Sequence, residues 1–302
     1  MTRSIKPARR IGCSPSDIVF DGFVYFVMTL TLIACAYPLY FILIASVSNP
    51  MQIALGKVII FPKEFSLEGY ERIFSYSKIW TGYANTLIYT VLGTSINLVC
   101  TITAGYALSR REMTGRGILL RLIAFTMFFS GGLIPTYMLV KGLALTDTIW
   151  AMVIPNAVQV WNLMITRSFF ESTIPDELLD AASIDGCGTL RFFARVVLPL
   201  SPAIISVMIL FYSISHWNAF FNAMLYLTKP KLMPLQLILR DILLSNQSTS
   251  MVDDVETLLE RQRVAEILKY GVIVVASVPV LILYPFMQKY FVTGIMVGAI
   301  KG

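Results

Sequence analysis

Six stretches of mostly apolar residues recur along the chain, and they constrain its fold more than any other feature. They lie at about 20–45, 83–108, 118–140, 149–167, 203–226 and 267–288. A helix needs about 20 such residues to cross the hydrocarbon core of a bilayer. Only 14% of the residues are charged, against about 25% in soluble domains, so polar groups could not cover a surface that faces water. The sequence therefore predicts an all-α membrane protein with six transmembrane helices, in one domain over 20–302 after a short segment at 1–19.

Basic residues flank the apolar stretches unevenly, which predicts an orientation. Four of them precede the first stretch: Arg3, Lys6, Arg9 and Arg10. The tight loop at 109–117 carries three more. Positive charge favours the cytoplasmic side of a membrane, so we expect both termini in the cytoplasm. The same placement accounts for the net charge of +6 without a nucleic-acid partner.

Several function classes require residues that the chain lacks. His216 is the one histidine, and the four cysteines have no metal-ligand spacing, so we expect no metal site or other cofactor on this chain. No GxxxxGK[ST] motif for ATP occurs. A membrane enzyme would need a cluster of acids, bases or nucleophiles, and an ion-coupled secondary transporter would need charges inside its spans. Both classes are disfavoured, although the secondary transporter stays as a distant alternative.

A polar insert separates the fourth and fifth apolar stretches, and we refer to residues 173–200 as the elbow. Its sequence includes "PDELLDAASIDGCGTLRFFARVVLPL". Acids after Pro175 favour a helix start, and Gly186 and Gly188 favour a turn before a second short helix. Such a helix–turn–helix could lie on lipid headgroups or protrude into a partner protein, and spacing alone leaves both open.

The elbow resembles the EAA loop of ABC importer permeases. That pattern is Glu-Ala-Ala, three residues, Gly, and later Leu-Pro; here Asp180-Ala181-Ala182, Gly186 and Leu198-Pro199 stand in those places. Asp180 replaces the usual glutamate, and Cys187 stands where a small residue is common. The stretches 216–243 and 289–302 extend the resemblance to the second permease of carbohydrate-uptake (maltose-type) systems. They are typical of the subgroup for uronic-acid oligosaccharides derived from alginate or pectin.

This resemblance implies a fold, partners and a role. The fold would be that of a type I ABC importer permease, in a bacterial plasma membrane. The partners would be a second permease, two copies of a cytoplasmic ATPase that holds ATP and Mg²⁺, and an extracytoplasmic solute-binding protein. The chain would be a non-catalytic subunit for oligosaccharide import; amino-acid or peptide import is the alternative substrate class. The residues that would contact the ATPase are Glu177, Asp180, Ala181, Ala182, Asp185, Gly186, Leu198, Pro199, Lys301 and Gly302.

Polar and aromatic side chains inside the apolar stretches are candidates for the substrate pathway. Polar groups within spans are costly and face a cavity or a neighbouring helix. The candidates are Asn156, Gln159, Tyr212, Trp217, Asn218 and Asn222, of which the last two are spaced to share a helix face. For each of them, hydrogen bonding between helices is the competing interpretation.

Overall fold

The computed structural model describes residues 15–245, 268–282 and 285, and within them the chain is helical, with a single isolated β-bridge between Ser48 and Phe65. The first helices are α1 Pro15–Ser46, α2 Pro50–Ala54, α3 Glu68–Ser75, α4 Ser77–Ser109, α5 Arg116–Phe128, α6 Leu133–Gly142 and α7 Trp150–Val153. There follow α8 Val160–Thr173, α9 Asp176–Ile184, α10 Thr189–Phe192, a π-helical turn Phe193–Val197, α11 Pro202–Trp217, α12 Phe220–Tyr226, a 3₁₀ turn Pro230–Leu232 and α13 Leu235–Ser245. A further apolar helix runs over Leu268–Ile282. The apolar spacing at 252–266 predicts an amphipathic surface helix, and this stretch lies outside the described residues.

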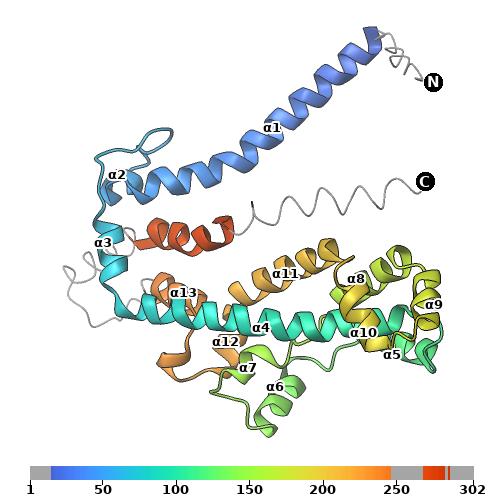
Figure 1. The fold of residues 1–302 in the computed structure, drawn as a ribbon. Coiled ribbons are helices and arrows are strands. Elements are labelled where there is room, and N and C mark those ends of the chain that lie inside the picture. Colours follow the sequence, from blue (N-terminus) through green and yellow to red (C-terminus); the bar gives the residue numbers. More distant parts are fainter. Residues whose placement is uncertain (1–14, 246–267, 283–284, 286–302) are drawn as a thin grey trace.

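Helix α4 is the centre of the fold, and α7, α8, α11 and α13 pack along it (Figure 1). Small residues on its buried face allow these close approaches. A Cβ added at Gly93 would stand 2.3 Å from the ring of His216 in α11, and one added at Gly105 would stand 2.6 Å from the side chain of Thr166 in α8. Between these two glycines, Asn97 and Thr101 are buried and bonded to neighbouring elements. The core of this protein is therefore organised by one continuous membrane-length helix.

Helix α1 projects away from the rest of the chain (Figure 1), and its apolar side chains are exposed around the whole helix. Contacts gather near its C-terminal end: the Tyr37 hydroxyl donates to the Ile59 carbonyl at 3.2 Å, and the Phe41 ring meets the Tyr270 ring at 5.8 Å. A helix that is apolar on every side is stable in lipid or against another protein and not in water. This finding places the chain in a membrane.

Two helices, Ser16–Ser46 and Ser77–Ser109, are long and apolar enough by themselves to cross a membrane. Two bent pairs add up to two more: Arg116–Phe128 with Leu133–Gly142, at 116°, and Thr189–Val197 with Pro202–Trp217, at 86°. The predicted ranges 20–45 and 83–108 thus correspond to single helices. Of the predicted range 267–288, residues 268–282 form one helix, and residues 283–284 and 286–288 lie outside the described part.

The other three predicted ranges are interrupted, and this corrects the sequence-based expectation of one helix in each. Range 118–140 holds α5 and α6, separated near Gly132, whose φ is +86°. Range 149–167 unwinds after α7, next to Pro155, and becomes helical again at Val160. Range 203–226 is broken at Asn218 and Ala219. Apolar length alone could not reveal these breaks, because other parts of the chain satisfy the freed backbone groups.

Candidate functional site

The elbow forms the predicted pair of short helices, α9 and α10, joined by a tight turn. Gly186 adopts φ +71°, a left-handed conformation that favours glycine. Its amide donates to the Ser183 carbonyl at 3.1 Å, and the Cys187 amide donates to the Ala182 carbonyl at 2.8 Å. These two bonds are those of a Schellman motif, so α9 ends at a geometrically fixed point.

The underside of the elbow is packed into the protein. Phe192 and Val197 are fully buried in a core with Phe170 of α8, and Ala182 and Cys187 pack against the same core. Cys187, which departs from the family pattern, is therefore a packing residue between the two short helices. The elbow is held as a rigid body on α8 and α11.

The outer surface of the elbow combines acidic and apolar side chains. Glu177, Asp180 and Asp185 are exposed. Ile184 and Leu190, on either side of the turn, are 87% and 85% exposed. We call Ile184 and Leu190 the apolar tip. The sequence reasoning missed both residues, although an isolated apolar residue on each side of the turn was the available signal.

The remaining predicted coupling residues divide by location. Ala181, Gly186 and Pro199 are exposed, whereas Leu198 is half-buried and its amide donates to the Phe193 carbonyl at 3.0 Å. Lys301 and Gly302 lie outside the described residues.

Arg110 connects the root of the elbow to the loop that follows α4. Its guanidinium donates to Asp176 Oδ1 at 3.1 Å and to the Ile174 carbonyl at 3.2 Å, and it lies 5.0 Å from the centre of the Tyr106 ring. Arg110 is only 9% exposed. A buried guanidinium that is paired in this way fixes the direction in which α9 leaves the bundle.

A second ion-pair cluster lies beside the first. Glu171 of α8 accepts from Arg116 at 2.7 Å and from Arg167 at 2.6 Å. Arg116 also donates to the Leu108 carbonyl at 2.8 Å. The loop at 109–117, which carries the predicted cytoplasmic charges, is thereby tied to the same end of α8 as the elbow.

The unwound segment at 154–159 gathers two of the pathway candidates. The side-chain amide of Asn97 donates to the Asn156 carbonyl at 2.6 Å and to the Ala157 carbonyl at 2.8 Å, and its oxygen lies 2.7 Å from His216 Nε2. The Gln159 amide donates to Ser215 Oγ at 3.1 Å. Asn97 therefore satisfies backbone groups that a regular helix would have paired, and it leaves the Asn156 side chain exposed.

Tyr212 and Trp217 are placed differently from the other candidates. Tyr212 is fully buried, and its hydroxyl lies 2.6 Å from that of Thr101. The Trp217 indole is 5% exposed and donates to the Ala276 carbonyl at 3.1 Å. Their geometry favours the competing interpretation, in which these side chains join helices.

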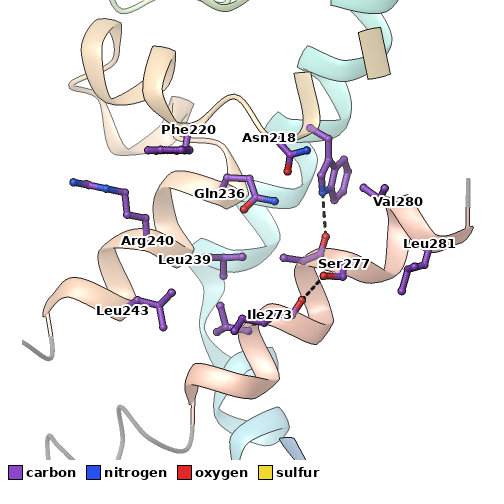
Figure 2. A pocket seen from close by; sticks show the side chains of 13 residues that line it. Asn218, Phe220, Gln236, Leu239, Arg240, Leu243, Ile273, Ser277, Val280 and Leu281 are labelled. Atoms are coloured by element: carbon purple, nitrogen blue, oxygen red, sulfur yellow. Dashed lines mark hydrogen bonds between the residues drawn. The ribbon is translucent and has the colours of Figure 1, made fainter. Parts of the chain in front are cut away.

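Asn218 and Asn222 do not share a helix face, because α11 ends at Trp217 and α12 begins at Phe220. The expectation from their spacing is wrong at this point. Asn218 instead lies at the rim of a groove between α11, α13 and the helix at 268–282 (Figure 2).

Comparison with known proteins gives consistent relatives over nearly the whole chain. No protein-family model matches. The polygalacturonan/rhamnogalacturonan transport system permease protein YtcP of Bacillus subtilis is 38% identical over 285 residues, which cover 94% of this chain and 99% of that protein. Protein LplC of Bacillus subtilis is 39% identical over 265 residues, or 88% of this chain and 89% of that protein. A solved chain of a bacterial ABC transporter involved in the import of the acidic polysaccharide alginate superposes with a TM-score of 0.83 at 31% identity, covering 93% of this chain and 99% of that one.

Proposed function

Because the chain belongs to the permease subunits of ABC transporters for sugars, we propose that it carries an acidic oligosaccharide across the plasma membrane of a bacterium. The names of YtcP and of the solved neighbour support this substrate class. Polygalacturonan and alginate, which these two proteins are named for, are both polymers of uronic acids. The chain itself is a non-catalytic subunit, and ATP is hydrolysed by a partner.

The elbow supports a coupling role, and its surface is the observation on which the proposal mainly rests. The apolar tip exposes two large aliphatic side chains, and burying them against a partner would be favourable. Exposed acids surround them on a helix whose other side is packed into the core. Such a knob fits a cleft on an ATPase, and two ATPase copies would engage this permease and a second permease.

The same arrangement supports the orientation and the six-span topology. The elbow and the loop at 109–117 meet at one end of α4, through Arg110 and Asp176. We infer that this end faces the cytoplasm, as the positive charges of the loop at 109–117 favour, and that the end of α4 far from the elbow faces a solute-binding protein outside. The expectation of cytoplasmic termini is compatible with this orientation. The interrupted ranges then count as spans made of broken helices.

Movement of the elbow would pass directly into the membrane-embedded part. The axis of Thr189–Val197 meets that of Pro202–Trp217 at 86°. A rotation of the elbow by the ATPase therefore swings α11, which packs along α4. Rigid-body rotation of packed elements is a common way to switch between two states.

The unwound segment at 154–159 supports a place on the substrate pathway. Irregular backbone at membrane depth is tolerated where it is buried in protein or lines a water-filled cavity. Asn156 and Gln159 would offer amide groups to sugar hydroxyls there, next to the exposed Ser215. Transporters often place their binding sites at such breaks.

The coupling role is tested by changing the apolar tip. Ile184→Ser and Leu190→Ser together should weaken binding of the ATPase about tenfold or more, because buried apolar anchors carry most of the energy of an interface. Both side chains are exposed, so the fold should be nearly unaffected. Co-purification of the ATPase from detergent measures the binding, and Ser183→Ala on the same helix is the matched control. Full retention of the ATPase by the double variant would refute the docking surface.

The substrate class is tested on the whole complex with its solute-binding protein. ATPase activity should rise with an oligosaccharide of uronic acids, such as trigalacturonate. Stimulation by an amino acid or a peptide, with none by any oligosaccharide, would overturn the sugar assignment in favour of the alternative class.

A further inference from the structure

A groove of about 680 Å³ lies where α11 ends, bounded by α13 and the helix at 268–282 (Figure 2). Its size falls within the range of about 300–1,000 Å³ that is usual for small-molecule sites. Its walls combine aliphatic residues with a few aromatic and polar ones. The residues that matter for its chemistry are Trp217, Asn218, Phe220, Gln236, Arg240 and Ser277.

The groove offers the groups that bind a sugar ring. The Phe220 ring is 41% exposed and presents a flat apolar face at the rim, which suits the C–H face of a pyranose. Gln236 of α13 is half-buried, and Figure 2 shows its amide turned toward the middle of the groove. Trp217 forms the wall, held by its bond to the Ala276 carbonyl at 3.1 Å. These contacts would accept a sugar but would not select an acidic one.

Arg240 supplies the selectivity for charge. Among the described residues that line the groove, it alone carries a charge at neutral pH. Its side chain is 38% exposed and extends toward the outer edge of the groove, away from Gln236 (Figure 2), so it would meet a carboxylate at that edge. Its ion pair among the described residues is a long contact of 3.5 Å with the adjacent Asp241. A guanidinium has five N–H donors in a planar fork, so most of them remain free to take a carboxylate in a bidentate pair.

The groove and the elbow lie at opposite ends of α4 (Figure 1). A Cβ at Gly82 would meet Ile238 of α13 at 2.6 Å, and one at Gly105 would meet Thr166 of α8 at the same distance. At about 1.5 Å of rise per residue, α4 separates these two glycines by about 35 Å, close to the hydrocarbon thickness of about 30 Å. If the elbow faces the cytoplasm, the groove opens at the outer surface.

We propose that this groove is an outer binding site for a carboxylated sugar unit, in which Arg240 pairs with the carboxylate while Phe220 and Gln236 contact the ring. The inference rests on the proposed function and deepens it. The groove is separate from the segment at 154–159. At the groove, this permease would distinguish a uronic acid from a neutral sugar as the substrate leaves the solute-binding protein.

The test uses the complete transporter with its solute-binding protein in vesicles, and it measures ATPase activity against trigalacturonate concentration. Arg240→Gln should raise the half-saturating concentration about tenfold, because a charge-assisted bidentate pair is lost. Arg240→Lys should restore part of that loss. Arg72→Gln is the matched control, since Arg72 is an exposed arginine on α3, paired within its own helix. It should leave the half-saturating concentration unchanged.

The methyl ester of trigalacturonate serves as a neutral probe of the same shape. Arg240→Gln should narrow the preference for the acid over the ester. Three results for Arg240→Gln would each overturn the inference. They are an equal rise in the half-saturating concentration for acid and ester, an unchanged value for both, and reduced co-purification of the second permease. The last result would mean that the groove is an interface between subunits. If neither sugar stimulates the wild type, it is the proposed substrate class that fails, which separates the two failures.

Discussion

Arg110 illustrates how much of the coupling geometry depends on a single side chain. It bonds a carboxylate and a carbonyl at the root of α9 and also lies against the Tyr106 ring. A lysine has the charge but neither the planar fork nor the flat face. The arrangement of Arg110 therefore depends on the guanidinium shape and not only on its charge.

Arg110→Lys should loosen the elbow without abolishing the fold. We expect a loss of about 1.5–3 kcal/mol in stability, the usual value of a hydrogen bond to a charged group. Because α9 would lose its fixed direction, fewer sugars should be carried for each ATP hydrolysed. Thermal unfolding and the ratio of uptake to ATP hydrolysis measure the two effects. Arg111→Lys, at the exposed neighbour, should change neither, and an unchanged ratio in Arg110→Lys would show that Arg110 has no positioning role.

Asp147 ties the loop between α6 and α7 to the loop that follows α12. Its carboxylate accepts from the Thr228 amide and hydroxyl, each at 2.6 Å, and from the Lys229 amide at 3.1 Å. Chiefly through the hydroxyl of Thr228, these bonds lower the pKa of Asp147 below its ordinary value of 3.8. A lowered pKa means that the tie stabilises the fold above the unfolded value and is lost as the pH falls through the folded one.

Asp147→Asn should therefore lower the unfolding temperature at pH 7 and have less effect as the pH falls below about 3.8. Asparagine tolerates the positive φ of 56° at this position, so the backbone should be kept. Unfolding followed in detergent between pH 7 and pH 3 measures the difference, with Asp180→Asn as the control. If the unfolding temperatures of the wild type and Asp147→Asn differed by the same amount at every pH in this range, the stabilising role of the ionised Asp147 would be refuted.

Single residues were also where the sequence was least informative. The elbow acids were predicted and are exposed, yet the apolar tip was not foreseen, because periodicity assigns isolated aliphatic residues to a core. Tyr212 is a candidate for the substrate pathway by sequence but lies buried against Thr101. Which face of a helix is covered depends on partners that are distant in sequence, and no local pattern records them.

At the scale of elements, the Schellman turn after α9 sets the angle between the two helices of the elbow. Gly186 has φ +71°, whereas Gly188 has an ordinary φ of −67°, and neither has a neighbour within 4 Å of the Cβ that a substitution would add. The two positions differ in backbone conformation and not in space.

Gly186→Val should therefore distort the elbow and reduce ATPase binding and uptake, at a cost of about 1–2 kcal/mol for a left-handed conformation. Gly188→Val adds the same side chain two positions away and should have a smaller effect. Gly186→Asn should be the mildest change at its position, because asparagine visits this region more readily. Co-purification of the ATPase and sugar uptake measure the effects. Equal losses in both valine variants would show that added bulk, not backbone strain, is responsible.

The helices themselves were predictable where one unbroken apolar run forms one helix, as in α1 and α4. The breaks at 129–132, 154–159 and 218–219 were not predictable. At 154–159 the deciding residue is Asn97, which lies on another helix and supplies the missing hydrogen bonds. Sequence windows evaluate each run by itself, whereas a break is stabilised by a partner from elsewhere.

At the scale of the whole molecule, the chain is incomplete as a globular unit. The contacts of helix α1 with other described helices lie near its C-terminal end, and its exposed apolar surface suits lipid or another subunit. The class of protein could be predicted from composition and the elbow motif. The way in which α1 departs from the bundle could not, because the surface that it would cover belongs to no part of the chain that the structure describes.

The two functional regions should act independently of each other. Ile184→Ser at the elbow should lower the maximal ATPase rate and leave the half-saturating sugar concentration unchanged, since the apolar tip would contact the ATPase and not the sugar. Arg240→Gln in the groove should do the reverse. Residues more than about 10 Å apart usually combine additively in free energy. A titration of the double variant measures this, and a strong deviation from additivity would mean that the two ends of α4 are energetically coupled.

The π-helical turn at Phe193–Val197 has a consequence for how the chain tolerates length changes. Its Leu198 amide reaches back five residues to the Phe193 carbonyl at 3.0 Å, where an α-helix would reach back four. The turn thus holds one residue more than an α-helix needs between the same flanks. Removing one residue there would let the stretch relax into ordinary α-helix, whereas a deletion anywhere else in α10 or α11 would turn the downstream side chains by about 100°. The π-helical turn is therefore the place in this segment where the chain can lose one residue and keep the direction of the elbow.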